Sequence, residues 1–198
     1  MSPSSNFCLE RCDFGDKRLT KRALFIGEAL SLKYGQPLSQ VFKNASDLKR
    51  TYEFLTNPKT SFVKVIQPHH VQTAHRVSEL PLVLAVGDTT YLDYKKIIAK
   101  REEYGPIGKG GNGLILHSTL AINPDNGQPL GLLWEKLWHR EHHKKKKKTR
   151  SIQEKESYRW VEAFSEVQKL LSENQLSQVN SPKVIHVFDA RRRYSRSI

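Results

Sequence analysis

Two apolar runs that each lead into an aspartate constrain the fold more than any other feature of this chain. Residues 82–86 (LVLAV) are consecutive apolar residues that Gly87 and Asp88 follow, and residues 183–188 (KVIHVF) lead directly into Asp189. Apolar runs of this length are typical of strands buried on both faces of a sheet. We therefore expect the two aspartates at the carboxyl ends of two core strands.

The pattern between these runs predicts how the sheet is connected. Residues 114–124 and 128–140 are predicted strands joined by the turn sequence Asp-Asn-Gly, and residues 153–174 form an amphipathic helical pattern. Three strands joined in order favour an antiparallel meander, and a helical crossover favours a fourth strand parallel to the first. The predicted apolar face of the helix is Trp160, Phe164, Val167 and Leu171.

The first 80 residues have a helical pattern. One helix is predicted within residues 16–33, a second from a cap at Ser46, and a third from residue 60 or 61 toward Val77, with a break or restart at Pro68. The predicted apolar faces are Leu19, Ala23, Ile26 and Leu30 in the first helix, and Leu48, Tyr52 and Leu55 in the second. The predicted fold class is therefore α/β: a helical module (residues 1–80) followed by a mixed sheet (residues 81–189).

Basic charge is concentrated in separate parts of the chain. The net charge is +13; residues 1–80 hold 12 basic and 7 acidic groups, residues 139–150 hold 7 and 1, and four arginines fall in the last nine residues. Separate basic patches suit a polyanion such as nucleic acid, while the alternative is a solvated charged surface. The candidate DNA contacts are Lys17, Arg18, Arg22, Lys49, Arg50 and Lys59, with Lys144, Lys145 and Lys146 of the lysine run.

The remaining composition favours an intracellular protein. No apolar stretch reaches the roughly 18 residues of a membrane span, and the N-terminus lacks the pattern of a secretory signal. Cys8 and Cys12 have no neighbouring His/Cys cluster that would complete a zinc site, so reduced thiols are expected.

The two aspartates suggest a metal site. If the first and fourth strands are adjacent and parallel, Asp88 and Asp189 meet at one edge of the sheet, where α/β proteins bind ligands. Two carboxylates side by side favour a hard cation such as Mg²⁺ or Mn²⁺ between them. The alternative for Asp88 is an Asx turn that ends its strand.

Several motifs occur in an order that resembles a known family. LAVGDTTYLDY, YGPIGKGGNG, LHSTLAINPDNGQPLGLLWEKLWHR, EKESYRW and VIHVFD are similar, in this order, to motifs of cut-and-paste DDE transposases of bacterial insertion sequences, of the kanamycin-resistance-transposon type. FGDKRLTKR and TYEFLTNP resemble the DNA-binding region of the same family. The resemblance runs from about Phe14 to Asp189.

This resemblance implies a ribonuclease-H-like catalytic domain that cleaves DNA and transfers strands with a pair of Mg²⁺ or Mn²⁺ ions. Asp88 matches the first catalytic aspartate and metal ligand, and Asp189 matches the second. The implied partner is duplex DNA at the terminal inverted repeats of the element, held by a homodimer, and no membrane is involved. The implied location is the bacterial cytoplasm, in association with the nucleoid.

The residues after Asp189 depart from the family pattern. The family continues with a sequence like Arg-Glu-Ala-Asp-Ile and later supplies a glutamate as third ligand, whereas this chain continues with ARRRYSRSI. One permitted coding of DARRRYSRSI, read one base later, gives Met-Arg-Glu-Gly-Asp-Ile-Ala-Glu-Val. We therefore interpret residues 190–198 as an out-of-frame tail on an incomplete ribonuclease-H-like domain.

Three hypotheses follow for the function. The first is a transposase truncated before its third carboxylate and inactive alone. The second is a DNA-binding fragment that regulates or inhibits a full-length transposase. The third is a general polyanion-binding protein, which equal affinity for unrelated duplexes would favour.

Overall fold

The computed structural model describes residues 8–94, 104–108, 111–140, 158–174 and 182–188. The chain divides into two compact units, Met1–Gln72 and Thr73–Ile198, which we call the N-terminal unit and the C-terminal unit. Helix α4 (Phe62–Ser78) contributes to both units. Each unit is described separately below.

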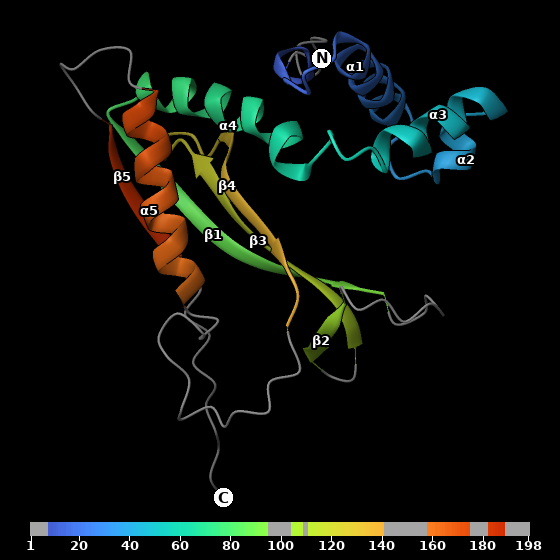
Figure 1. Cartoon of the computed structure of the whole chain (residues 1–198). Coiled ribbons are helices and arrows are strands. Elements are labelled where there is room, and N and C mark those ends of the chain that lie inside the picture. Colours follow the sequence, from blue (N-terminus) through green and yellow to red (C-terminus); the bar gives the residue numbers. More distant parts are fainter. Residues whose placement is uncertain (1–7, 95–103, 109–110, 141–157, 175–181, 189–198) are drawn as a thin grey trace, which may run out of the picture. The chain divides into compact units, whose positions relative to one another are not determined.

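The N-terminal unit is helical, as predicted (Figure 1). It contains η1 (Leu9–Arg11), α1 (Lys17–Leu32), α2 (Leu38–Val41), α3 (Ala45–Leu55) and the first part of α4. The single-turn helix α2 was not predicted, and α4 continues through Pro68 although proline cannot donate a hydrogen bond to the preceding turn. The buried core of this unit consists of Cys12, Phe14, Ala23, Ile26, Val41, Phe42 and Phe54.

Helix α3 differs in detail from the prediction. Its N-cap is Asn44, whose side chain accepts a hydrogen bond from the Ser46 amide, so Ser46 is not the cap. Thr51 and Phe54 are the buried residues of the helix, whereas Tyr52 and Leu55 are 51% and 54% exposed. Thr51 can be buried because its hydroxyl donates to the Asp47 carbonyl oxygen at 2.8 Å.

The C-terminal unit is built on a mixed sheet with the predicted connections. Its strands are β1 (Leu82–Asp93), β2 (Gly105–Gly108), β3 (Gly111–Ile122), β4 (Pro129–Trp138) and β5 (Lys183–Phe188). Strands β1 and β3 pair antiparallel, as do β3 and β4, while β5 pairs with β1 in parallel. This arrangement confirms the predicted meander and the parallel fourth strand.

The glycine-rich segment also contributes to the sheet. Strand β2 pairs antiparallel with the start of β3. Gly113 permits a close approach there, since a Cβ at this position would collide with the Leu92 carbonyl oxygen. The segment therefore forms a short hairpin.

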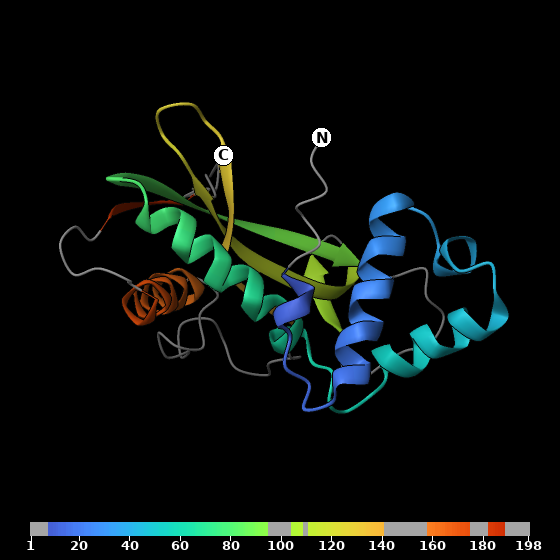
Figure 2. The same cartoon turned by 90° about the horizontal axis from the view of Figure 1, so that it is seen from above.

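One face of the sheet is covered by helices. Helix α5 (Tyr158–Glu173) lies along the sheet beside β5 and β1 (Figure 1), and the part of α4 in this unit, residues 73–78, lies on the same side (Figure 2). The core between these layers consists of Ala74, Val77, Val83, Ala85, Ala121, Leu133, Val167 and Leu171. Only alternate residues of β1 are buried, so the expectation of burial on both faces was wrong for this strand.

The buried face of α5 also differs from the prediction. Ala163 is buried together with Val167 and Leu171, whereas Phe164 is exposed at the edge and contacts the His186 ring. Small Ala163 lets the helix approach the sheet closely. No helix within the described ranges has the length and apolarity to cross a bilayer.

Candidate functional site

The first turn of α1 is held by a compact loop before it. Gly15 has a φ of +70°, and its amide donates to Asp13 Oδ1 at 2.8 Å. Asp16 caps the helix by accepting a hydrogen bond from the Arg18 amide at 2.9 Å. The Arg18 guanidinium also bonds the Asp16 carboxylate and, with the amide, lowers the pKa of this exposed group.

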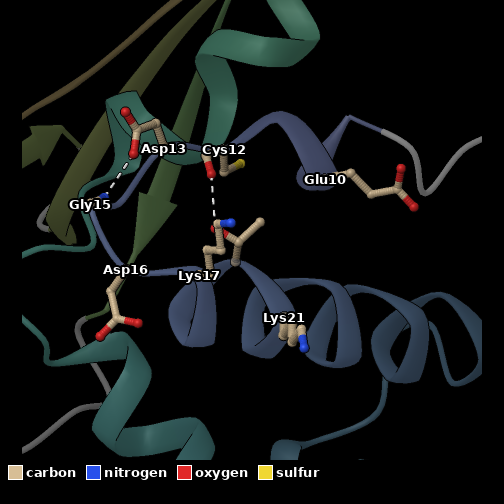
Figure 3. Close-up of a pocket in the computed structure, with 8 residues that line it drawn as sticks. Glu10, Cys12, Asp13, Gly15, Asp16, Lys17 and Lys21 are labelled. Atoms are coloured by element: carbon tan, nitrogen blue, oxygen red, sulfur yellow. Dashed lines mark hydrogen bonds between the residues drawn. The ribbon is translucent and has the colours of Figure 1, made fainter.

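A shallow pocket of about 520 Å³ lies beside this turn (Figure 3). Thr20 fixes the turn by donating its hydroxyl to the Cys12 carbonyl oxygen at 3.0 Å. Lys17 and Lys21 line the pocket together with Glu10, Asp13 and Asp16, so its charge is mixed. The hydrogen bonds of this turn therefore hold Lys17 and Lys21 in place in the first turns of α1.

The predicted DNA contacts of α1 fall into two groups. Lys17 and Arg18 are exposed, with 90% of the Arg18 side chain accessible. Arg22 is partly buried, pairs with Asp47 of α3 at 3.4 Å and lies over the Phe25 ring. Arg22 thus ties α1 to α3, while Lys17 and Arg18 are exposed to solvent, Arg18 with its guanidinium on Asp16 of the same turn.

Helix α3 presents a second set of exposed basic groups. Lys49 and Arg50 lie on its solvent side, and Lys59 is exposed just beyond its end. Lys49 is 3.9 Å from Glu53 one turn later, an exposed pair that holds the lysine only weakly. Tyr52 is exposed on the same helix, so an aromatic ring accompanies the positive charges.

Asp88 lies inside strand β1 rather than at its end. It is the seventh of 12 residues, is exposed, and is paired with Ser118 of β3. The strand continues because Thr89, Thr90 and Tyr91 have high strand propensity and pair with β3. The position at a strand end and the Asx-turn alternative were therefore both wrong for Asp88.

Strand β5 pairs with β1 as far as the residue that precedes Asp88. Phe188, the last described residue of β5, pairs with Gly87, which immediately precedes Asp88. Asp189 follows Phe188 in the sequence and lies outside the described residues. Lys144, Lys145 and Lys146 also lie outside them.

The helix-covered face of the sheet holds a buried polar side chain next to β1, which no sequence pattern indicated. His117 of β3 is 2% exposed, and its Nδ1 is 2.7 Å from Thr89 Oγ1. Burial lowers the pKa of His117, while the charge of Asp88 acts in the opposite direction. The imidazole is therefore neutral near pH 7.

Aromatic rings surround this imidazole. The Trp160 ring stands edge-on to His117 with centroids 4.2 Å apart, and Phe188 contacts Trp160 at 4.6 Å. Arg159 lies over the Trp138 ring at 4.5 Å, and Glu162 forms ion pairs with Lys136 and Arg159. The motifs GDTT, LHS and YRW therefore meet around His117, although their separation in the sequence does not predict this contact.

The described residues contain no group of three or more His, Cys, Asp or Glu side chains suited to a metal ion. Cys8 and Cys12 are free thiols that donate to Gln72 Oε1 and the Val65 carbonyl oxygen. Burial, with a smaller contribution from Cys8, raises the pKa of Cys12, which suits a structural thiol.

A comparison with protein families identifies the N-terminal region. Residues 6–60 match the transposase DNA-binding family. This range contains η1, α1, α2 and α3, together with the exposed basic groups described above. The match covers less than half of the chain and supports a transposase-related, DNA-binding role.

Proposed function

We propose that this chain is a DNA-binding protein of the DDE transposase type, in which the N-terminal unit holds duplex DNA. The observation that carries the proposal is the exposed basic surface of α1 and α3 within the matched residues 6–60. Lys17, Arg18, Lys49, Arg50 and Lys59 all reach solvent there. Cationic side chains on a rigid helical scaffold bind phosphates and release counterions, so affinity falls as salt increases.

The C-terminal unit supports the second part of the proposal, a ribonuclease-H-like domain with a metal-binding pair, Asp88 and Asp189. The supporting observation is the parallel pairing of β1 with β5, in which Gly87 is opposite Phe188. Carboxylate oxygens are suitable ligands for Mg²⁺ or Mn²⁺. Two such ions, when bound, stabilise the attacking and leaving oxygens of a phosphodiester displacement.

Catalysis of this type also needs a third carboxylate, which we do not assign to any residue of this chain because residues 190–198 depart from the family pattern. We therefore expect the chain alone to bind DNA without cutting it or transferring strands. The alternative function, regulation of a full-length transposase, follows from the same property, because a chain that occupies DNA ends without cleaving them competes with an active copy. We further propose that the chain dimerises on DNA ends and acts at the nucleoid of a bacterial cytoplasm.

The experiment that tests DNA binding is selection from a random duplex pool, followed by fluorescence anisotropy over a series of KCl concentrations. We expect enrichment of one sequence class and tighter binding to it than to unrelated duplexes or RNA. The variant Lys49→Gln/Arg50→Gln is expected to lower the salt slope by roughly 0.9 for each lost phosphate contact. Its matched control is Lys169→Gln/Lys183→Gln, which removes the same charge from exposed positions of the C-terminal unit.

Each outcome decides between the hypotheses. Equal loss of affinity in both double variants, or equal affinity for all polyanions, contradicts a specific site on α3 and favours general polyanion binding. A gel assay with the selected duplex and Mn²⁺ tests the second expectation: cleavage that Asp88→Asn abolishes would show that these residues suffice for catalysis. Sedimentation of the chain with a DNA that carries two copies of the selected site tests whether two chains bind as a dimer.

A further inference from the structure

We propose that Thr89, His117 and Trp160 form a positioning set that holds Asp88 from the opposite side of the sheet. The inference rests on the proposed function, in which Asp88 is a metal-binding carboxylate. Successive residues of a strand point to opposite faces, so Gly87 and Thr89 face the helices when Asp88 faces away from them. Both neighbours of the acid are fixed on that covered face.

The first contact fixes the residue after the acid. Thr89 Oγ1 and His117 Nδ1 are 2.7 Å apart, a hydrogen bond in which either atom can donate, depending on the tautomer. Thr89 and His117 also lie directly opposite each other in the β1–β3 register. The bond therefore adds a side-chain link to the backbone ladder one residue beyond Asp88.

The second contact fixes the residue before the acid. A Cβ on Gly87 would lie 2.7 Å from Trp160 Cζ3 and 2.8 Å from Phe188 Cδ1, so both rings press on the bare backbone of Gly87. Trp160 also touches His117, edge to face at 4.2 Å. One indole thus links both neighbours of Asp88 and connects them to α5 and β5.

The cost of burying His117 argues against a role in packing alone. Its Nε2 is buried without a hydrogen-bond partner, and leaving a buried polar atom unpaired destabilises the folded state. An apolar side chain at this position would fill the space without that cost. The imidazole is neutral, because burial lowers its pKa. It can therefore orient Thr89 through a hydrogen bond without adding charge beside Asp88.

The test compares two threonines of the same strand. Thr89→Val removes the hydroxyl that contacts His117 and keeps the β-branched shape, while Thr90→Val makes the same change at the exposed neighbouring position. Thr89→Ser retains the hydroxyl, and Asp88→Asn is the reference for loss of the ligand. The probe is Mn²⁺ alone with the full chain, measured through the electron paramagnetic resonance signal of free Mn²⁺, alongside the melting temperature of each variant.

We expect Thr89→Val to weaken Mn²⁺ binding about tenfold, in the range seen when a group that orients a metal ligand is lost. Thr89→Ser and Thr90→Val should retain the affinity of the parent chain. A purely structural Thr89 would lower the melting temperature of Thr89→Val but leave the Mn²⁺ affinity of the folded protein unchanged, and this result overturns the positioning role.

The Asp88→Asn reference separates this inference from the proposed function. If Asp88→Asn binds Mn²⁺ as the parent does, or the parent shows no saturable binding, the metal site itself is wrong and the positioning role fails with it. If Asp88→Asn loses Mn²⁺ while Thr89→Val does not, the metal site stands and only the positioning role is wrong.

Discussion

The two units of the chain differ in how their polar side chains are buried. In the N-terminal unit the core is apolar apart from Thr51, whose hydroxyl is satisfied within its own helix, and no charged side chain of the described residues is fully buried. In the C-terminal unit His117 and Thr119 are buried between the sheet and the helices. Among the described residues, every buried side-chain polar atom without a hydrogen-bond partner belongs to the C-terminal unit: His75, His117, Thr119, Trp138, Arg159, Glu162 and His186.

This difference shows how each proposed role constrains the fold. A surface that binds phosphates needs exposed cations, so the core beneath it can be optimised for stability alone. A carboxylate that must point in one direction needs support from behind, and this support places polar groups where burial is costly. We therefore expect the N-terminal unit to tolerate surface changes and the C-terminal unit to respond to small changes near β1.

The largest effect is expected from Phe14→Ala in the N-terminal unit. Phe14 is fully buried and packs edge-to-face on Phe54, with ring centroids 5.7 Å apart. Its truncation should cost about 3–5 kcal/mol and abolish DNA binding. All three tryptophans lie in the C-terminal unit, so their fluorescence should still report a folded sheet. Loss of the tryptophan signal as well would show that the units are not separately stable.

Gly87→Ala is expected to have the next largest effect, and in the opposite unit. The added methyl group meets the rings of Trp160 and Phe188, and such overpacking costs about 1–3 kcal/mol. The urea midpoint of the tryptophan transition should fall, while anisotropy with duplex DNA should be unchanged. A parent-like midpoint would mean that the rings move aside freely and that the support behind Asp88 is loose.

Acid should weaken the C-terminal unit first. Burial lowers the pKa of His117 and His186 below the ordinary value of 6.5. The unfolded chain then takes up protons that the folded unit does not, so the free energy of unfolding decreases as the pH falls through 6.5. The lowered pKa of Asp16 acts in the N-terminal unit only near and below 3.8.

The measurement for this third prediction is the urea midpoint by tryptophan fluorescence between pH 7.5 and 5.5, values that bracket the ordinary histidine pKa of about 6.5. The double variant His117→Phe/His186→Phe should flatten the dependence. An equally steep dependence in that variant would assign the effect to other groups.

The smallest effects distinguish two arginines that the sequence places in one motif. Arg22→Gln breaks the pair with Asp47 and should cost less than about 1 kcal/mol of stability, with little change in DNA affinity. Arg18→Gln should leave stability almost unchanged and lower the salt slope of DNA binding by roughly 0.9. Reversed results would show that Arg22 leaves Asp47 to contact DNA.

The elements with strong periodicity could be predicted from the sequence, and the contacts between distant residues could not. The parallel pairing of β5 with β1 followed from the helix between them, and the buried residues Ala23 and Ile26 followed from helical spacing. The buried face of α3 could not be predicted in this way, because threonine is a polar residue. Thr51 is buried only because its hydroxyl donates a hydrogen bond within its own helix.

For the candidate site, the sequence pattern pointed only to the acids, which remain a prediction. Asp88 was singled out because it follows an apolar run, but the strand was expected to end with that run at Val86, since Gly-Asp-Thr-Thr also suits a turn. The support by His117 and Trp160 joins three segments separated by long stretches of chain. No local pattern encodes which histidine will lie behind which aspartate.

The parallel pairing of β1 with β5 has a kinetic consequence. Roughly 100 residues separate Gly87 from Phe188, whereas β3 and β4 follow one another within a hairpin. Such a pairing forms slowly, because the long intervening segment loses conformational entropy before the contacts between the strands stabilise it. On a ribosome that adds about 5–20 residues per second, β1 waits several seconds for its last neighbour. During that interval its outer edge is open to other strands, and it is then that a chaperone or a second nascent chain could capture it.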